Sequence, residues 1–404
     1  MDALARDLRD LAAIGADPEG GVTRVAWSPA LLEALHWFAE RGRAVGATTA
    51  IDAAGNAFLR AGGGASAGPA FLIGSHLDTV PRGGAYDGAL GVLAGLDVLR
   101  HFHESGDAPG CPVWVTAFMD EEGTRFGTAL FGSRAFAGHD LSDLAARADK
   151  AGVTVAEAMQ ACGRDAAALG EAQAIDRVRG YLELHIEQGP VLEQSGEQIG
   201  VVTSIVGLLG LQVRLTGQAN HAGTTPMDMR RDALAGASRA VLELRDLARR
   251  LPTVTANVGT IAVEPGGKNV IPGACSFSVD IRAADQATYL TLDAATRATL
   301  ARIASEESLG LEVTEIYRLA PVPMDTAFVD AIERAAELEG ASHRRMPSGA
   351  GHDAQVIAPH VPAGMLFVPS RGGISHNPAE HTEPEQCATG SRVLARAVKL
   401  LSHA

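Results

Sequence analysis

Three consecutive acids, Asp120, Glu121 and Glu122, follow the apolar run "CPVWVTAFM" at residues 111–119. Adjacent carboxylates repel one another, and a buried carboxylate is costly unless a cation or a proton compensates its charge. The stretch therefore has two interpretations. It is either a solvated strand end followed by a turn, or a metal site with its general base.

A second candidate lies in "GSHLDTV", where His76 and Asp78 occupy positions i and i+2 near the end of an expected strand. Side chains with this spacing share one face of a strand. A metal-ligating histidine usually donates its second ring N–H to a carboxylate, and Asp78 is placed to receive it. Alone, the pair is weak evidence and also fits two unrelated surface residues.

Three further residues add to the set. Asp87, in the turn "GGAYDGALG", could cap the next helix, or it could bridge two cations because its glycine neighbours allow close approach. His185 lies inside the apolar strand "LELHIEQGP", where a core histidine is the usual interpretation, and His376 follows a strand in "GGISHNPAEHT". Ligands of α/β sheets bind outside the carboxyl ends of the strands, so these segments could meet there.

The expected elements support such a sheet. Apolar strand-like runs alternate with Ala- and Leu-rich helical stretches up to about residue 205 and again after 321, which indicates an α/β domain. The glycine-rich stretch 61–68 is expected to be a loop or a hairpin. The strand candidates are 69–80, 111–120, 179–188 and 363–370, and the helix candidates include 30–46 and 87–106.

Between about 209 and 321 the pattern becomes βαββαβ, the ferredoxin-like order of a small antiparallel sheet covered by two helices. Its first helix is predicted over about 226–250, with Thr224 or Thr225 as N-cap and Pro226 at the first position. The chain of 404 residues is long enough for two domains. We expect one domain from 1–208 and 322–404, with 209–321 inserted as a smaller one.

Composition limits the classes of function. Hydrophobic residues make up 46% and charged residues 20% of the chain, which is typical of a globular protein. The net charge of −14 argues against nucleic acid or an anionic membrane as partner. Four well-separated cysteines, no signal-like N-terminus and no long apolar run lead us to expect a soluble cytoplasmic protein with reduced, mostly buried thiols.

Eight segments together resemble one family, the amidase/carbamoylase branch of the M20 metallopeptidase superfamily. That branch includes N-carbamoyl-L-amino-acid hydrolases, β-ureidopropionases and allantoate amidohydrolases. The resemblance runs in order from about residue 50 to 390, so it is far more specific than any one motif. The segments are "GSHLDTVP", "YDGALGVLAGLDVL", "DEEGTRFG", "ALFGSRAFAG", "ELHIEQGPVLE", "GQANHAGTTPMDMRRDA", "GHDA" and "PSRGGISHNPAEHT".

The resemblance implies an α/β fold: a larger mixed-sheet, metallo-aminopeptidase-like catalytic domain carrying an inserted ferredoxin-like lid and dimerisation domain. It also implies a centre of two divalent metal ions, usually zinc, with manganese, cobalt or nickel active in some members. Three imidazoles with two carboxylates suit such ions. Carried over to this chain, the ligands are His76 and His185 on one ion, Glu122 and His376 on the other, and Asp87 as the bridge.

The same resemblance gives other residues a role. Glu121 corresponds to the general base, and Asp78 to the residue that orients His76, whereas Asp120 is expected to be a solvated or turn-stabilising bystander. In the family, a histidine at the position of His221 crosses from the partner subunit to the scissile carbonyl, which implies a homodimer. The substrate carboxylate would meet Asn269, Arg282 and the backbone at Gly373, with Gln188, His352 and Asp353 behind the ligands.

These implications predict a metal-dependent amidohydrolase acting on a linear ureido or amide bond, most simply that of an N-carbamoyl-L-amino acid. The alternatives are an allantoate amidohydrolase, a β-ureidopropionase, and an N-acyl-amino-acid deacylase or peptidase. A non-catalytic metal-binding scaffold should have lost the base or a ligand, and this chain keeps them all. One departure is Leu208–Leu209–Gly210, where the family commonly has a polar or aromatic pair with arginine; it favours an apolar substrate side chain over allantoate.

Overall fold

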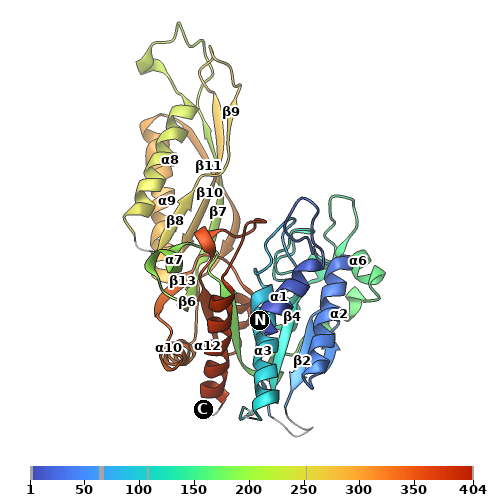
Figure 1. Ribbon diagram of the computed structural model, residues 1–404. Coiled ribbons are helices and arrows are strands. Elements are labelled where there is room, and N and C mark those ends of the chain that lie inside the picture. Colours follow the sequence, from blue (N-terminus) through green and yellow to red (C-terminus); the bar gives the residue numbers. More distant parts are fainter. Residues whose placement is uncertain (1–2, 63–67, 107–108, 252, 403–404) are drawn as a thin grey trace. The chain divides into compact units, whose positions relative to one another are not determined.

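The computed structural model describes residues 3–62, 68–106, 109–251 and 253–402. The chain divides into two compact units, which are described here one at a time. The larger comprises Met1–Thr203, Met324–Met346 and Ala350–Ala404, and the smaller Ser204–Pro323 with Pro347–Gly349. Figure 1 labels their elements. That the first is catalytic and the second a lid and dimerisation domain stays a prediction.

A mixed sheet forms the centre of the larger unit (Figure 1). The neighbours β4–β3–β5–β14 run parallel, whereas β1, β2, β6 and β12 pair antiparallel at the two sides. The predicted fold class is confirmed. Within the described residues the strands of this sheet are β1 Thr48–Ile51, β2 Ala57–Ala61, β3 Ala70–His76, β4 Val113–Phe118, β5 Val178–Ile186, β6 Ile199–Ile205, β12 Val322–Pro323, β13 His343–Ser348 and β14 Ala363–Val368. Strand β12 and the last residues of β6 and β13 fall within the bounds of the smaller unit.

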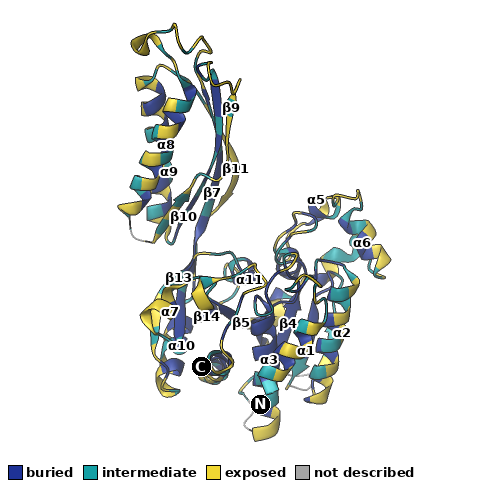
Figure 2. Ribbon diagram, turned by 45° about the horizontal axis from the view of Figure 1, so that its top comes forward, coloured by how far each residue is buried: buried dark blue, intermediate teal, exposed yellow. Residues whose placement is uncertain are grey.

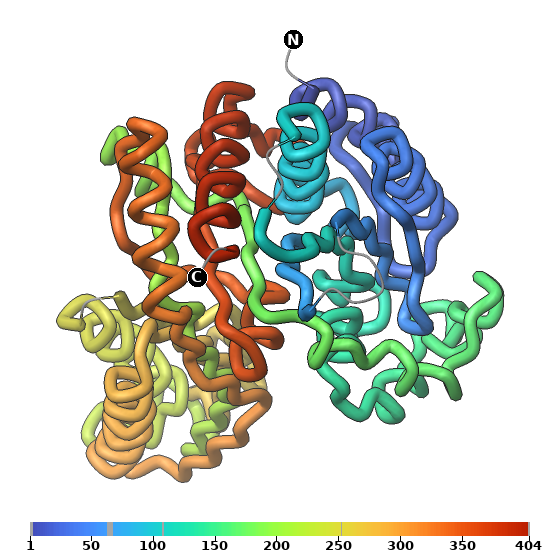
Figure 3. The backbone as a smooth tube through the Cα atoms, turned by 90° about the horizontal axis from the view of Figure 1, so that it is seen from below, coloured from blue at the N-terminus to red at the C-terminus, as the bar shows by residue number. Residues whose placement is uncertain are grey.

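The central strands are continuous apolar runs because helices cover them on both faces. Every residue of β3, β4 and β14 is buried, and α3 (Ala89–Ser105) is buried around most of its circumference, as predicted. Helix α12 (Pro384–Ser402) packs against α3 (Figure 3). The other helices of this unit are α1 Ala3–Ala13, α2 Pro29–Ala44, α4 Phe131–Phe136, α5 Ser142–Ala145, α6 Val155–Ala161, α7 Val191–Ser195, α10 Thr326–Leu338 and α11 Asp353–Ile357.

The smaller unit has the predicted ferredoxin-like order. Its antiparallel sheet runs β11–β7–β10–β8, with β9 also paired to β10. Helices α8 and α9 cover one face of the sheet (Figure 2). The buried apolar residues of these helices and of strands β7 and β10 form one core. The elements are β7 Gly207–Thr216, α8 Ala233–Arg249, β8 Val254–Asn257, β9 Ile261–Glu264, β10 Ala274–Ala283, α9 Gln286–Glu306 and β11 Gly310–Leu319.

Two predictions for this unit are wrong in detail. Helix α8 starts at Ala233 with Asp232 as its N-cap, not near Thr224 or Thr225, and a short 3₁₀ turn at Met227–Met229 precedes it. The strand that follows this helix in the predicted βαββαβ order is broken into β8 and β9, because the Thr260 N–H donates to the Ser278 hydroxyl instead of continuing the ladder.

Other expectations are met only in part. Residues 63–67, the centre of the predicted glycine-rich loop, lie outside the described residues. All four cysteines are free thiols, but only Cys275 and Cys387 are buried, while Cys111 and Cys162 are half-buried. In the part of the chain that the structure describes, no helix is long and apolar enough to cross a membrane.

Candidate metal centre and active site

The predicted site residues of the larger unit meet at the carboxyl end of its parallel strands. His76 is the last residue of β3, His185 is the penultimate residue of β5, and Asp87 lies just before α3. His376 lies in the loop between β14 and α12, and Glu122 follows β4. Parallel strands end at one edge of a sheet, so four distant segments converge on one point.

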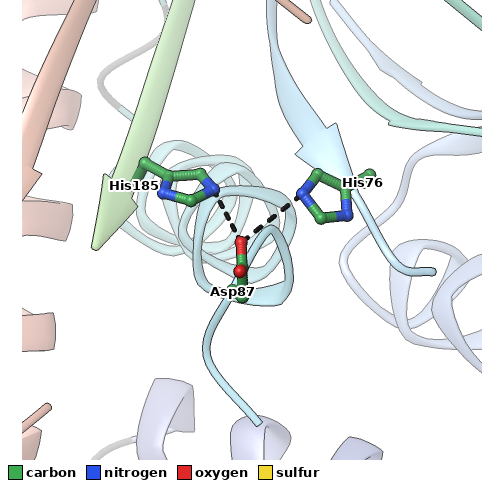
Figure 4. A group of neighbouring side chains, drawn as sticks. All are labelled: His76, Asp87 and His185. Atoms are coloured by element: carbon green, nitrogen blue, oxygen red, sulfur yellow. Dashed lines mark ion pairs between the residues drawn. The ribbon is translucent and has the colours of Figure 1, made fainter. Parts of the chain in front are cut away.

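The first group consists of His76, Asp87 and His185 (Figure 4), all at most 5% exposed. The Oδ1 atom of Asp87 lies 3.1 Å from His185 Nε2 and 3.7 Å from His76 Nε2. The Nδ1 atom of each ring faces a main-chain carbonyl, Asp78 O at 3.0 Å and Ile186 O at 2.9 Å. A carbonyl can only accept, so the Nδ1 atom of each ring donates to it, and Nε2 is the ring nitrogen that faces the group.

A second group shares the same aspartate. The Oδ2 atom of Asp87 lies 3.1 Å from His376 Nε2, and Glu122 Oε1 lies 3.4 Å from that nitrogen. The His376 side chain is 49% exposed, so this group opens to solvent while the first is closed. Asp87 therefore presents one carboxylate oxygen to each group, which is the geometry of a bridging ligand.

The chain turns sharply after β4 to bring Glu121 and Glu122 to the same site. Strand β4 ends at Phe118, and Asp120 has a φ of +57°. The next two N–H groups both donate to the Asp78 carboxylate, at 3.2 Å from Glu121 and 3.1 Å from Glu122. Glu121 Oε2 lies 3.7 Å from His76 Nε2, beside the first group.

Two acids differ from expectation. The His76 ring bonds the main-chain carbonyl of Asp78, not its carboxylate, whose Oδ1 lies 3.8 Å from the ring and binds the backbone after β4. Asp120 is not solvated, because it is 1% exposed and accepts a hydrogen bond from the Thr128 hydroxyl. The turn-stabilising alternative for Asp120 is the one that the structure supports.

The charges of the site fit bound cations. Burial, and next the neighbouring Asp87, raise the pKa of Glu122 to about 8, and burial raises the pKa of Glu121 well above its usual range. The hydrogen bond to Asp87 raises the pKa of His376 to about 9. A divalent ion beside these buried carboxylates would compensate their charge and oppose the rise in their pKa. Burial lowers the pKa of His76, which favours the neutral imidazole that binds a metal.

Residues around the two groups hold them in place. Gln188 donates from Nε2 to Asp87 Oδ2 at 2.8 Å. The His352 ring packs edge-on against His185 with centroids 4.5 Å apart, and the buried Asp353 begins α11. A Cβ on Gly373 would lie 2.7 Å from the Pro190 nitrogen, so this glycine permits the 371–373 turn to touch another chain segment.

Sequence reasoning missed two buried glutamates. Glu183, two residues before His185 on β5, accepts hydrogen bonds from the Ser75 hydroxyl (2.7 Å), the Tyr181 hydroxyl (3.0 Å) and the Ala354 N–H (3.0 Å). Glu380 accepts from the backbone beside Asp87. An acid inside an apolar strand was the signal for Glu183, whereas Glu380 stands in a polar loop that gives no such signal.

The remaining predicted residues belong to the smaller unit. His221 is exposed and lies outside the named strands, next to Asn269. It forms an isolated β-bridge with Val270, and the Ala222 N–H donates to the Asn269 carbonyl at 2.9 Å. Arg282, on β10, binds the Asp280 carboxylate at 3.1 Å and the Gly349 carbonyl at 2.8 Å. The structure thus brings His221 and Asn269 together in neighbouring loop segments, whereas Arg282 lies on strand β10 of the sheet.

Comparisons with known proteins find relatives over nearly the whole length of this chain. The pattern of Peptidase family M20/M25/M40 matches residues 72–400. An N-carbamoyl-L-amino acid amidohydrolase from Geobacillus stearothermophilus is 39% identical, covering 98% of this chain and 97% of the relative. An allantoate amidohydrolase from Escherichia coli is 38% identical, covering 97% and 96%.

A crystal structure of a hydantoinase/carbamoylase family amidase from Burkholderia multivorans superposes with a TM-score of 0.91 at 39% identity, covering 99% of this chain and 97% of that one. The likeness therefore extends over both units, and the buried His, Asp and Glu groups lie within the region that the family pattern matches. The chain belongs to peptidase family M20/M25/M40, in its hydantoinase/carbamoylase branch, and is a metal-dependent amidohydrolase of that family.

Proposed function

We propose that this protein hydrolyses N-carbamoyl-L-amino acids to the L-amino acid, ammonia and carbon dioxide. The observation that carries the proposal is the Asp87 carboxylate, which offers one oxygen to His76 and His185 and the other to His376, with Glu121 beside it. The donors suit two zinc ions per subunit, and manganese, cobalt or nickel would fit the same N and O atoms. His76 and His185 would hold one ion, Glu122 and His376 the other, and Asp87 both.

When bound, the metal ions would supply Lewis acidity and lower the pKa of a water molecule at the site. Glu121 would take a proton from the attacking water and return it to the leaving nitrogen, as a general base and then a general acid. Its carboxylate is buried, and both its own N–H and that of Glu122 are held by Asp78, so its position is well defined. The carbamate that is released then decays to ammonia and carbon dioxide.

Residues of the smaller unit would recognise the substrate. Arg282 and Asn269 would bind the substrate carboxylate, since a guanidinium matches a carboxylate in a two-pronged hydrogen bond. His221 of the partner subunit would donate a hydrogen bond to the developing oxyanion, which requires a homodimer. Gln188, which donates to Asp87 Oδ2, and the Gly373 backbone would line the substrate site.

Substrate choice rests on a different observation. Leu208 is half-buried, Leu209 is fully buried, and a Cβ on Gly210 would lie 2.4 Å from the Tyr317 ring. The start of β7 therefore offers no polar side chain to a second ureido group. This favours an N-carbamoyl amino acid with an apolar side chain over allantoate, the substrate that the 38% identical relative is named for.

A parallel assay of ammonia release tests the proposal. Zinc-loaded protein is given N-carbamoyl-L-methionine, allantoate and N-carbamoyl-β-alanine, and N-acetyl-L-methionine is followed by release of methionine. We expect the first substrate to give the highest kcat/KM. A higher kcat/KM for allantoate would replace the proposed substrate with the second candidate, and faster deacetylation would indicate a deacylase.

A further inference from the structure

A buried acid outside the proposed ligand set touches the segment that carries Asp87. Glu380 is 5% exposed and lies in the loop between His376 and α12. It belongs to none of the groups of His, Cys, Asp and Glu side chains in the described residues that are close enough to share an ion. Its position therefore needs another explanation than direct metal binding.

The contacts of Glu380 are all made to the two segments that hold metal-ligand candidates. Its Oε1 atom accepts the backbone N–H groups of Tyr86 at 3.0 Å and Asp87 at 3.1 Å. Its Oε2 atom accepts the Ser375 hydroxyl at 2.9 Å. Both carboxylate oxygens are occupied by donors, so the side chain joins the turn before α3 to the residue preceding His376.

The turn before α3 is built closely around this carboxylate. A Cβ on Gly84 would lie 1.9 Å from Glu380 Oε1 and 2.5 Å from Glu380 Cβ, so only glycine leaves room for the side chain. The donors on Tyr86 and Asp87 are consecutive N–H groups, and binding both fixes the peptide plane between them. The direction in which the Asp87 side chain leaves the backbone is set at the same point.

The Ser375 hydroxyl adds a second connection. Its oxygen lies 2.9 Å from Glu380 Oε2 and 3.2 Å from Asp87 Oδ2, but a hydroxyl has only one proton to donate. While Glu380 accepts that proton, Asp87 Oδ2, which already accepts a hydrogen bond from Gln188 Nε2 at 2.8 Å, keeps its other electron pair for the direction of His376. Partners of this kind orient a ligand and tune its basicity without touching the metal.

We propose that Glu380 is a positioning residue that fixes Asp87 between the two metal positions, through the backbone N–H groups of Tyr86 and Asp87 and through Ser375. The inference rests on the proposed role of Asp87 as the bridging ligand. Its consequence is measurable as zinc affinity, because a misaligned Asp87 would weaken both positions together. Loss of a partner that orients a ligand typically weakens metal binding by about 10- to 100-fold.

Three variants separate geometry from charge. Glu380→Asp keeps the charge but is one methylene shorter, so it cannot reach both N–H donors, and zinc affinity should fall by about 10- to 100-fold. Glu380→Gln keeps an oxygen for the two N–H groups, so its loss should be smaller. Glu385→Gln is the matched control, since it removes a carboxylate from the same region whose side chain is 81% exposed, and zinc affinity should stay within about twofold.

The experiment titrates zinc into metal-free protein in competition with a chromophoric chelator, with the unfolding temperature of each metal-free variant measured alongside. Wild-type zinc affinity in Glu380→Asp with a lowered unfolding temperature would mean that Glu380 only stabilises the fold, and would overturn the inference. If Glu380→Asp does not fold, Glu380→Gln decides: a loss of affinity supports the inference and none overturns it. The zinc affinity of Asp87→Asn is measured in parallel. If it equalled that of the wild type, Asp87 would not be a metal ligand, and both the proposed site and the inference about Glu380 would be refuted.

Discussion

A single methyl group at Gly88 should damage the metal centre. Gly88 follows Asp87, is the N-cap of α3 and has a φ of +64°. A Cβ built there would lie 2.4 Å from two atoms of the His76 ring, Cε1 and Nε2, and 2.5 Å from Cδ2. Because an ordinary contact is at least 3.4 Å, Gly88→Ala would force the imidazole to retreat by about 1 Å or tilt the turn that carries Asp87.

The size of the effect follows from that displacement. Misplacing a reacting group by about 1 Å can cost on the order of 100-fold in rate, and a disturbed ligand sphere about 10- to 100-fold in metal affinity. The alanine also loses about 1–3 kcal/mol of stability to backbone strain, because a φ of +64° with a ψ of −47° lies outside the regions that alanine populates. Ammonia release, zinc titration and urea unfolding measure these three quantities on the same protein.

The other end of the same helix provides the control. Gly106 is the C-cap of α3 with a φ of +69°, and a Cβ at this residue would have no atom of the described residues within 4 Å. Gly106→Ala should lose about 1–2 kcal/mol of stability through its left-handed backbone, and should keep its zinc affinity and kcat/KM. If the zinc affinity and the kcat/KM of Gly88→Ala were no lower than those of Gly106→Ala, the claim that Gly88 leaves space for the His76 ring would be refuted.

Other perturbations test separate parts of the site. Glu121→Gln should lower kcat by about 10²- to 10⁴-fold, the usual contribution of a general base, while zinc affinity changes little; near-normal kcat would exclude Glu121 as the base. The Asp78→Asn side chain would have one acceptor oxygen for the two N–H groups of Glu121 and Glu122, so kcat should fall about 10- to 100-fold at saturating zinc. An unchanged kcat would show that the turn holds its conformation without the Asp78 carboxylate. Removing metal with a chelator should abolish ammonia release, and zinc at 100 times its Kd should raise the unfolding free energy by about 2.7 kcal/mol; activity that survives chelation would contradict a metal-dependent reaction.

The residues at the strand ends could be predicted from the sequence. His76 and His185 stand at the ends of runs so apolar that only a strand buried on both faces explains them, and such strands end at one edge. Their convergence with Asp87 follows from the parallel order, which the alternation of strands and helices already indicated. The ring orientations do not follow from that order, because they depend on the carbonyls of Asp78 and Ile186.

The start of α8 shows where local signals mislead. Thr224, Thr225 and Pro226 form a good helix start by residue type, yet the helix uses Asp232, whose carboxylate accepts the N–H groups of Leu234 and Ala235. The Arg230 guanidinium donates to the carbonyls of Ala222 and Thr225, which holds the preceding segment as a loop. Two possible N-caps therefore lie within ten residues of each other. The residue types at the two caps do not determine which one the helix uses.

The hydrogen-bond acceptors of the site were the least predictable part. Glu380 lies 293 residues from Asp87 in the chain, and its partners are backbone N–H groups, which every residue except proline possesses. Nothing in the sequence can single out such a partner. By contrast, only a few residue types bind metal ions, here His, Asp and Glu, so the motifs in which they cluster could be recognised in the sequence.

The acids at 120–122 show how a short stretch divides its tasks. On a regular strand, Glu121 and Glu122 would point to opposite faces, and a base and a ligand could not serve one site. The strand ends before them, and the left-handed Asp120, held by the Thr128 hydroxyl, turns the chain so that both N–H groups reach Asp78. Asp120, which takes no part in the proposed chemistry, is therefore the residue that lets Glu121 and Glu122 face the same site. Any change that straightens the chain at Asp120 should separate the proposed base from the proposed ligand.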